Sequence, residues 1–456
     1  MKKSDMENLQ RNLSERHVQF VALGGAIGIG LFLASGSAIA VAGPSLLVTY
    51  LLAGIIIYFI MRALGEIAVE NPISGSFSAY AHKFISPCAG FMVGWTYWFL
   101  WVLSCMAEVT AVGIYFTFWW PELPQWIPAL ASLLCLMVSN LFNVKVFGEL
   151  EFWLTLIKTI TIVAIIAIGL AIIFFGFGNI SHHIGISNLY ALNGGFFPYG
   201  FSKVFKVLNI AIVAFVGVEF IGIAAGEIKN PEKSIPSSIN KVLFSIILLY
   251  IGTLFVIMCI YPWMNISKGS GVAESPFVST FAGLGIKQAA AIINFVVITA
   301  SFSSCNSGMF SNGRMLYNLA LKKQAPQFLA KVNSNKIPAN AIIASSVIAL
   351  MSVPLNYIMP GKAFLSLLSI IVFLALWVWG SIIVIQMYSR RGKSSEDISK
   401  LKYPMLFYPY TSFISLVALA AVAIMVATEN PLGLIISFTW LVLIYCFYKL
   451  FVKEKI

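Results

Sequence analysis

The chain of 456 residues is 59% hydrophobic and only 10% charged, and its formal net charge is +12. A soluble protein would carry about 25% charged residues, so the composition excludes that class and predicts an all-α polytopic membrane protein. The basic residues are scattered over many segments, which excludes the concentrated basic groove of a nucleic-acid-binding protein.

Apolar segments of about 20 residues, the length at which a helix crosses a bilayer, recur along the whole chain. Residues 17–61 form a run without Lys, Arg, Asp or Glu that is long enough for two spans, and Gly43-Pro44 indicates the turn between them. We predict twelve transmembrane helices, at 18–41, 45–66, 88–119, 126–142, 152–175, 204–226, 240–262, 286–312, 338–357, 363–388, 403–427 and 431–451.

Lysine and arginine are distributed unequally between the two sides of this predicted bundle. They concentrate in the N-terminal tail, the even-numbered loops and the C-terminal end, whereas the odd-numbered loops hold Lys203, Lys206, Lys268, Lys287 and Lys362. Because basic residues are retained on the cytoplasmic side of a membrane, both termini are expected to be cytoplasmic.

The first span contains Gly24-Gly25-Ala26-Ile27-Gly28-Ile29-Gly30, with four glycines in seven residues. Glycine in a helix interior costs roughly 1 kcal/mol relative to alanine, so the cluster indicates either close helix packing or a break in the helix. A break would leave amides near Gly30 free to bind a carboxylate. Gly24 and Gly28 also fit the G-x-x-x-G contact pattern, so the packing interpretation stays open.

The sixth span has a comparable feature in Ala214-Phe215-Val216-Gly217-Val218-Glu219, where a glycine and a carboxylate lie in mid-membrane. Carbonyl groups freed by a break there would accept hydrogen bonds from an ammonium group. The two breaks together therefore suit an α-amino acid, as in transporters built from inverted repeats. Gly217 is also compatible with helix packing, whereas a carboxylate such as Glu219 inside a membrane is usually functional.

The sequence lacks the residue patterns of common enzymes and metal sites. It contains no G-x-S-x-G, H-E-x-x-H or G-x-x-x-x-G-K-[ST] motif, its four histidines fall in tails and loops, and its six cysteines form no C-x-x-C pair. We therefore predict neither an enzyme nor a protein that uses a metal or another cofactor.

Eight stretches carry a joint pattern: RNLSERH at 11–17, GGAIGIGLF at 24–32, AGPS at 42–45, RALGE at 62–66, FGELEFW at 147–153, GEIKNPEKSIP at 226–236, SCNSG at 304–308 and RML at 314–316. Together they resemble the signatures of the amino acid transporter family within the amino acid–polyamine–cation superfamily. The resemblance implies a leucine-transporter-like fold, in which two inverted five-helix repeats precede two further helices. It also implies proton-driven import of an amino acid across a membrane, expected to be a bacterial plasma membrane.

On this resemblance the chain divides into a cytoplasmic tail at 1–17, a first repeat at 18–175, an outward loop at 176–202, a second repeat at 203–388, a cytoplasmic loop at 389–402, and the last two helices with the C-terminus at 403–456. Residues 94–99, 214–219 and 293–297 are most similar to the D-serine/D-alanine/glycine permeases, which implies a small neutral substrate. Two features depart from that branch: Glu108 stands where it tends to have aspartate, and 71–78 do not follow its loop.

The resemblance also gives roles to residues inside the spans. The predicted substrate site comprises Ala26, Gly28, Ile29, Gly30, Glu108, Phe215, Val216, Gly217, Val218 and Glu219, and the predicted proton-coupling site comprises Lys158, Ser303 and Ser304. Lys158 is expected to replace the cation of sodium-coupled relatives and to donate to carbonyl groups near Gly24–Ala26 and to one of the two serines. The alternatives are snorkelling of Lys158 to the interface and a structural hydrogen bond for Glu108.

Other functions stay open at this stage. A permease for a different amino acid or an exchanger would share these features, and a sensor that binds an amino acid without moving it would keep the same site. A channel would need a repeated polar ring, and a membrane-embedded enzyme would need a nucleophile or metal cluster, neither of which is visible in the sequence.

Overall fold

The computed structural model describes residues 15–73, 75–142, 144–175, 184–191, 194–228, 230–266, 275–283, 287–359 and 362–453. The predicted tail up to residue 14, the histidine pair at 182–183 and residues 454–456 lie outside this description. Within it the chain consists of helices joined by short connections and contains no β-strand. Helices suit a membrane because each satisfies its own backbone hydrogen bonds.

Long helices form the body of the bundle. They are α4 (Leu46–Glu70), α6 (Pro87–Phe116), α7 (Trp126–Phe142), α8 (Val144–Phe175), α12 (Pro231–Ile260), α15 (Lys287–Leu321), α16 (Ala339–Ala349) with α17 (Ser352–Ile358), α18 (Ala363–Ser389), α20 (Tyr410–Glu429) and α21 (Pro431–Phe447). The shorter helices are α1 (Glu15–Ala26), α2 (Ile29–Phe32), α3 (Ala34–Ala42), α5 (Ser76–Phe84), α9 (Ser202–Lys206), α10 (Leu208–Val213), α11 (Phe220–Ile223), α13 (Trp263–Ile266), α14 (Pro276–Gly283) and α19 (Ser395–Ser399).

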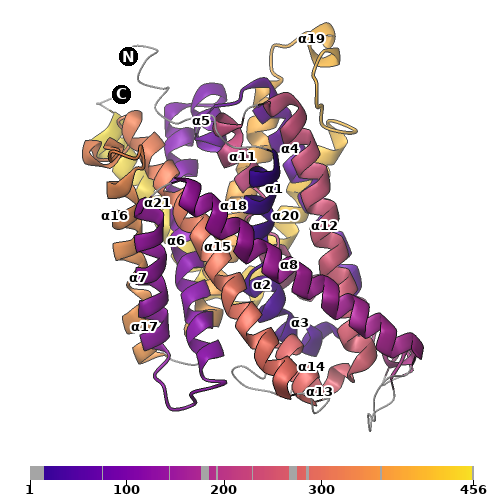
Figure 1. Cartoon of the computed structure of the whole chain (residues 1–456). Helices are drawn as coiled ribbons and strands as arrows, with labels where there is room; N and C mark the ends of the chain where they lie inside the picture. The colour runs from indigo at the N-terminus through magenta and orange to yellow at the C-terminus, as the bar shows by residue number, and fades with distance from the viewer. Residues whose placement is uncertain are drawn as a thin grey trace.

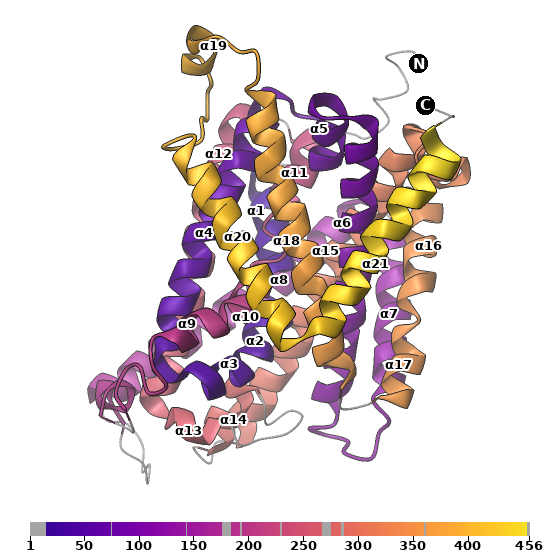
Figure 2. The same ribbon diagram turned by 180° about the vertical axis from the view of Figure 1, so that it is seen from behind.

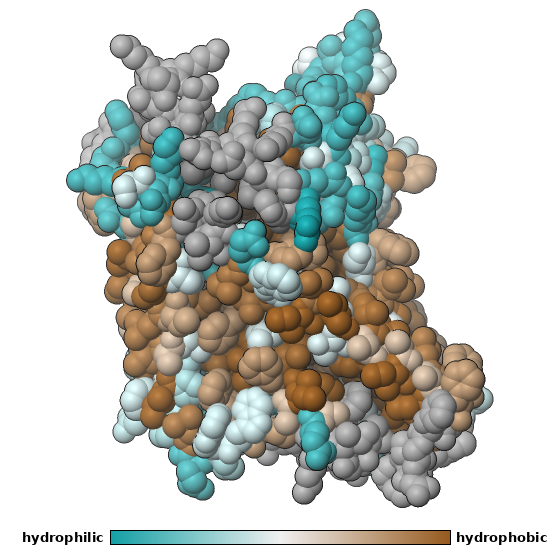
Figure 3. Space-filling model, in the orientation of Figure 1, coloured by the Kyte–Doolittle hydropathy of each residue, from teal (hydrophilic) through white to brown (hydrophobic). Residues whose placement is uncertain are grey.

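The described helices have the lengths and composition of membrane spans. Nine helical stretches among them are long and apolar enough to cross a bilayer, and two shorter ones, Val18–Phe32 and Trp126–Phe142, are also apolar. On the face that Figure 3 shows, apolar residues form a broad band, and hydrophilic residues gather at the end that carries α19. The polytopic all-α class predicted from composition is confirmed, while the layout as twelve spans in two inverted repeats stays a prediction.

Four predicted helices have clearly different ends in the structure, among them the seventh, which begins at Pro231 rather than 240. The fifth predicted span begins at Val144 rather than 152, and the eighth runs to Leu321 rather than 312. Hydropathy marks where a helix leaves lipid, and the backbone hydrogen bonds of a helix continue beyond that point. The eleventh begins at Tyr410 rather than 403.

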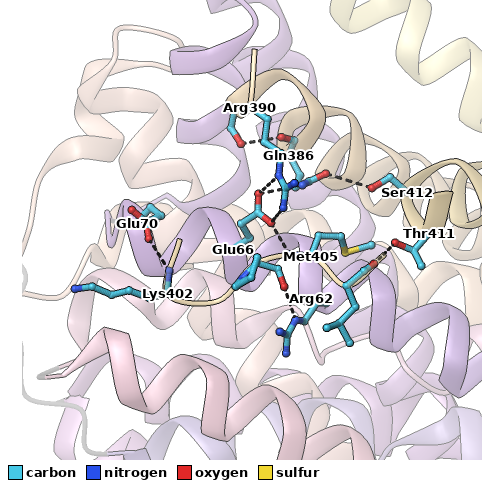
Figure 4. A network of polar contacts seen from close by, with 12 residues as sticks. Arg62, Glu66, Glu70, Gln386, Arg390, Lys402, Met405, Thr411 and Ser412 are labelled. Atoms are coloured by element: carbon cyan, nitrogen blue, oxygen red, sulfur yellow. Dashed lines mark hydrogen bonds and ion pairs between the residues drawn. The ribbon is translucent and has the colours of Figure 1, made fainter. Parts of the chain in front are cut away.

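Residues 401–409 form no helix because α4 engages their backbone, as Figure 4 shows. The carboxylate of Glu66 accepts a hydrogen bond from Met405 N at 2.5 Å, and Arg62 Nε donates to the carbonyl oxygen of Pro404 at 2.9 Å. Glu66 also pairs with Arg390 at the end of α18, with Nε to Oε1 at 2.7 Å. Both members of this pair are buried, so each offsets the cost of burying the other's charge, and the pair ties α4 to α18.

The interrupted helices lie at the centre of the bundle. Segment α1 contacts α11, and α2 contacts α10, while α6, α8, α12, α15 and α18 pack around them. Figures 1 and 2 show these short segments enclosed by the long helices from both sides. The described chain begins and ends at the same end of the bundle, where α5 and α19 also lie.

Candidate functional site

The first helix breaks inside the glycine cluster. Helix α1 ends at Ala26 and α2 begins at Ile29, and Gly28 between them has φ −136° and ψ −146°, outside the helical region. The Gly28 amide turns back to the carbonyl oxygen of Ala26 at 3.0 Å. The break therefore takes the backbone out of its i to i−4 hydrogen-bond pattern near the middle of the bundle.

The second break faces the first at backbone contact. Helix α10 ends at Val213 and α11 begins at Phe220, and Gly217 between them has φ +115°. A Cβ atom at Gly217 would lie 2.5 Å from the carbonyl carbon of Gly25, and one at Gly30 would lie 2.5 Å from Cα of Ala214. Only glycine allows these approaches, so the glycines serve both helix interruption and close packing.

Two tyrosines, which our sequence reasoning did not identify, hold the carbonyl groups of the breaks. Tyr250 of α12 directs its hydroxyl at the carbonyl oxygens of Ala26 at 2.8 Å and Ala214 at 2.7 Å, one from each break. Tyr50 of α4 directs its hydroxyl at Gly30 O at 3.4 Å. A buried tyrosine hydroxyl usually finds a hydrogen-bond partner, but nothing in the sequence indicates which one.

A small cavity of about 20 Å³ lies at the meeting point of the two breaks. Its lining residues are Gly25, Ala26, Gly28, Ile29, Gly30, Trp101, Ser104, Glu108, Val213, Val216, Ser304, Leu368 and Ile371. A space of this size holds about one water molecule, so an amino acid fits only after the surrounding helices separate. Most of the lining is apolar, and Glu108 is its single ionisable side chain.

Glu108 reaches the first break from α6. Its side chain is buried, Oε1 lies 3.5 Å from the amide nitrogen of Ile29, and Oε2 has no hydrogen-bond partner among the described residues. The carboxyl group therefore stands beside the amides that were predicted to hold a substrate carboxylate. Of the three polar or charged side chains predicted in or near the site from α6 and α15, Glu108 and Ser304 line the cavity and Ser303 does not.

Glu219 lies behind the second break rather than in the cavity. Its Oε2 accepts from Gly217 N at 3.0 Å and from Trp379 Nε1 at 3.4 Å, and its Oε1 accepts from Trp101 Nε1 at 3.2 Å. Because these donors come from α6, α18 and the break itself, Glu219 fixes the shape of the turn. Among the predicted residues of this break, Val216 lines the cavity.

Lys158 of α8 is fully buried, and its ammonium group lies on the first break. Nζ donates to the carbonyl oxygens of Gly24 at 2.5 Å and Ile27 at 2.9 Å, and to Ser303 Oγ at 2.9 Å. The side chain therefore does not snorkel to the interface in this structure. Ser304 contacts the same break differently, through a hydrogen bond from its Oγ to Gly25 O at 3.1 Å.

Glu151, one of the residues quoted for the family resemblance but given no role there, lies next to this group. Its Oε1 accepts from Ser303 Oγ at 2.5 Å, and its Oε2 accepts from Asn306 Nδ2 at 2.9 Å. Asn306 Oδ1 in turn accepts from Asn140 Nδ2 at 2.8 Å. A polar network thus links α7, α8 and α15 with the first break.

A helical membrane protein with two interrupted helices that face each other at a closed central cavity has the architecture of a secondary transporter. The family model described as amino acid permease matches residues 17–456, and the chain belongs to this family. It is therefore an amino acid permease, a transporter and not an enzyme.

Several bacterial relatives match over nearly their whole length. The chain is 48% identical over 444 residues to "Uncharacterized amino acid permease YtnA" of Bacillus subtilis (strain 168), covering 97% of this chain and 95% of the relative. It is 42% identical over 445 residues to "Amino-acid permease AapA" of the same organism, with 97% and 95% covered. It is 43% identical over 447 residues to that organism's "Probable threonine/serine transporter YbxG", with 98% and 96% covered.

Proposed function

We propose that this permease imports a small neutral amino acid across a bacterial plasma membrane together with a proton, by alternating access. The observation that carries the proposal is the cavity between the two helix breaks, whose lining is apolar apart from Ser104, Glu108 and Ser304. No basic side chain of the described residues lines it, so an acidic substrate side chain would find no partner there.

In this proposal the two breaks bind the two charged groups of the substrate. Amides near Ile29 hold the carboxylate, because the start of a helix carries partial positive charge. At the second break, the carbonyl groups of Phe215, Gly217 and Val218 accept turn hydrogen bonds from the backbone, and that of Ala214 accepts from Tyr250. The carbonyl group of Val216 is then the acceptor offered to the substrate ammonium.

Lys158 supplies the proton dependence. Its ammonium group occupies a position ringed by two carbonyl oxygens and a hydroxyl, an arrangement that would otherwise suit a bound cation. Loss of its proton would remove one of its three N–H donors and its positive charge, so its hold on the carbonyl groups of Gly24 and Ile27 would weaken and the first break would loosen. Sodium is therefore not required for transport.

Within this proposal we favour a substrate that carries a hydroxyl group, such as serine or threonine. Ser104 Oγ and Ser304 Oγ line the cavity, and each donates to a carbonyl group and can still accept a hydrogen bond. The name of the relative YbxG, a probable threonine/serine transporter, supports the same class of substrate. The resemblance to the D-serine/D-alanine/glycine branch would add D-isomers to this class. Both termini are cytoplasmic in this scheme, and the repeats span 18–175 and 203–388.

The test is uptake by purified protein in proteoliposomes, with an inward proton gradient and a panel of labelled L- and D-amino acids. Serine, threonine, alanine and glycine should accumulate in sodium-free buffer. Dependence on sodium, or preference for charged or aromatic substrates, would contradict the proposal. Counterflow in preloaded vesicles separates a transporter from a sensor, since only a transporter exchanges labelled substrate.

A further inference from the structure

A single hydroxyl joins Lys158 to a second ionisable group that the function proposed above does not use. Ser303 Oγ accepts a hydrogen bond from Lys158 Nζ at 2.9 Å and donates one to Glu151 Oε1 at 2.5 Å. A serine hydroxyl has one proton to donate and lone pairs that accept, so it fills both roles at once. All three side chains are buried, at 0%, 0% and 1% exposure for Lys158, Ser303 and Glu151.

We propose that Glu151 is the acid that takes the proton from Lys158, with the Ser303 hydroxyl as the relay, and then releases it to the cytoplasm. This inference rests on the proposed proton symport. In the relay step an N–H bond of Lys158 breaks, and its proton forms an O–H bond on Ser303. The original Ser303 proton moves at the same time to Glu151 Oε1. Lys158 ends neutral, Glu151 ends as the neutral acid, and Ser303 is again a hydroxyl.

The surroundings of Glu151 favour such an exchange because its nearby charged partners are few. Lys158 belongs to the same helix, Glu108 of α6 interacts electrostatically with Lys158, and α1 contributes Arg16, whose guanidinium lies 4.1 Å from the ring centroid of Phe152. Towards α15, Glu151 faces only the neutral groups of Ser303, Asn306 and Ser307 among the described residues. Proton transfer from Lys158 to Glu151 therefore converts a buried ion pair into two neutral groups, which the apolar interior tolerates.

Helix α1 provides the exit. A Cβ atom at Gly24 would collide with Glu151 Oε1 and lie 2.5 Å from Thr155 Oγ1, so the backbone of α1 covers Glu151 directly. The carbonyl oxygen of Gly24 is also an acceptor for Lys158. Movement of α1 away from α8 thus removes one acceptor from the lysine and exposes Glu151 in the same step. Release of the proton is thereby linked to opening of the first break.

The experiment compares proton-driven uptake with counterflow in the same proteoliposomes. Exchange needs no net release of a proton, so the ratio of the two initial rates reports proton release. For Glu151→Gln and Ser303→Ala the ratio should fall about 100-fold, the usual contribution of a positioned acid or base. Ser303→Thr should restore it, because the hydroxyl is retained. The matched control is Glu149→Gln, an exposed position two residues away on the same helix, whose ratio should equal that of the wild type.

The outcomes separate the two proposals. A wild-type ratio in Ser303→Ala, or equal losses of uptake and counterflow in both variants, would overturn the relay while leaving proton symport intact. Absence of proton-driven uptake in the wild type would remove the proposed function and the relay with it. If a thermal unfolding measurement shows that Glu151→Gln is not folded, the rate ratio of Ser303→Ala alone tests the relay, since that variant leaves the Glu151 carboxylate in place.

Discussion

The hydroxyl of Tyr250 offers a direct test of whether the two helix breaks act as one unit. Substitution of Tyr250 by phenylalanine removes one oxygen atom and leaves the ring, which packs edge-on to Tyr50 at 5.7 Å between centroids. The buried carbonyl groups of Ala26 and Ala214 then lose their shared donor. Ala26 keeps the amide of Gly28, whereas Ala214 keeps no hydrogen bond that the structure describes outside regular helix bonding.

The expected loss follows from these contacts. One carbonyl group remains partly satisfied and the other does not, so about 2 kcal/mol should be lost from the closed arrangement of the breaks. We expect the same hydroxyl to hold both carbonyl groups in the substrate-bound arrangement as well, so the same free energy corresponds to about 30-fold weaker substrate binding. Tyr50→Phe should cost less than about 1 kcal/mol, because its single contact to Gly30 is 3.4 Å long, beyond the usual length of a hydroxyl hydrogen bond.

The assay is the substrate dissociation constant of purified protein, measured beside the thermal unfolding midpoint. Tyr410→Phe is the control, since that side chain is 72% exposed. Substrate affinity should weaken most in Tyr250→Phe, less in Tyr50→Phe and least in Tyr410→Phe. In each variant the loss of binding free energy should exceed the loss of unfolding free energy. Wild-type affinity in Tyr250→Phe would refute the idea that its hydroxyl positions the breaks.

Four further predictions follow from single contacts. Gly217→Val should abolish measurable substrate binding, because its φ of +115° and its contact with Gly25 leave no space for a side chain; wild-type affinity would rule out the site. Glu108→Gln should change selectivity or the pH dependence of uptake, whereas an unchanged profile would make Glu108 purely structural. Lys158→Ala should abolish proton-driven accumulation, and survival of accumulation in uptake assays would exclude the coupling role. Glu66→Gln should lower stability by about 3 kcal/mol by leaving Arg390 unpaired, and Glu66→Gln with Arg390→Met should recover part of that loss in thermal unfolding.

Local chemistry made the helix breaks predictable from sequence. Glycine is costly in a helix, and both the cluster at 24–30 and the single Gly217 lie where the structure leaves the helical path. The polytopic class followed from composition for a similar reason, since few charged residues are compatible with a large lipid-facing surface. The signal for each break lies within one short segment, and the signal for the class requires no knowledge of which segments contact one another.

Contacts between distant segments made the rest unpredictable. Tyr250 is 224 residues from Ala26, and Met405 is 339 residues from Glu66, so no local pattern indicates either hydrogen bond. The start of α20 was predicted too early because the backbone preceding it is held by α4. Glu219 was predicted at the substrate site because a carboxylate inside a membrane is costly, and its three donors, two tryptophans and a backbone amide, are contacts that the sequence does not indicate; its role in substrate binding stays a prediction.

The first break is where the proposed substrate and proton sites meet, and this suggests how they are coupled. Lys158 holds the carbonyl groups of Gly24 and Ile27, while the amide of Ile29, two residues later, faces Glu108 and the cavity. A substrate carboxylate bound at these amides would therefore contact a segment whose conformation depends on the charge of Lys158. Because Gly217 packs directly on the backbone of Gly25, any shift of this segment must also move the second break. Loss of one proton can then alter both ends of the substrate site and so change the affinity of the site for the substrate. Coupled transport requires such a difference in affinity between the two protonation states.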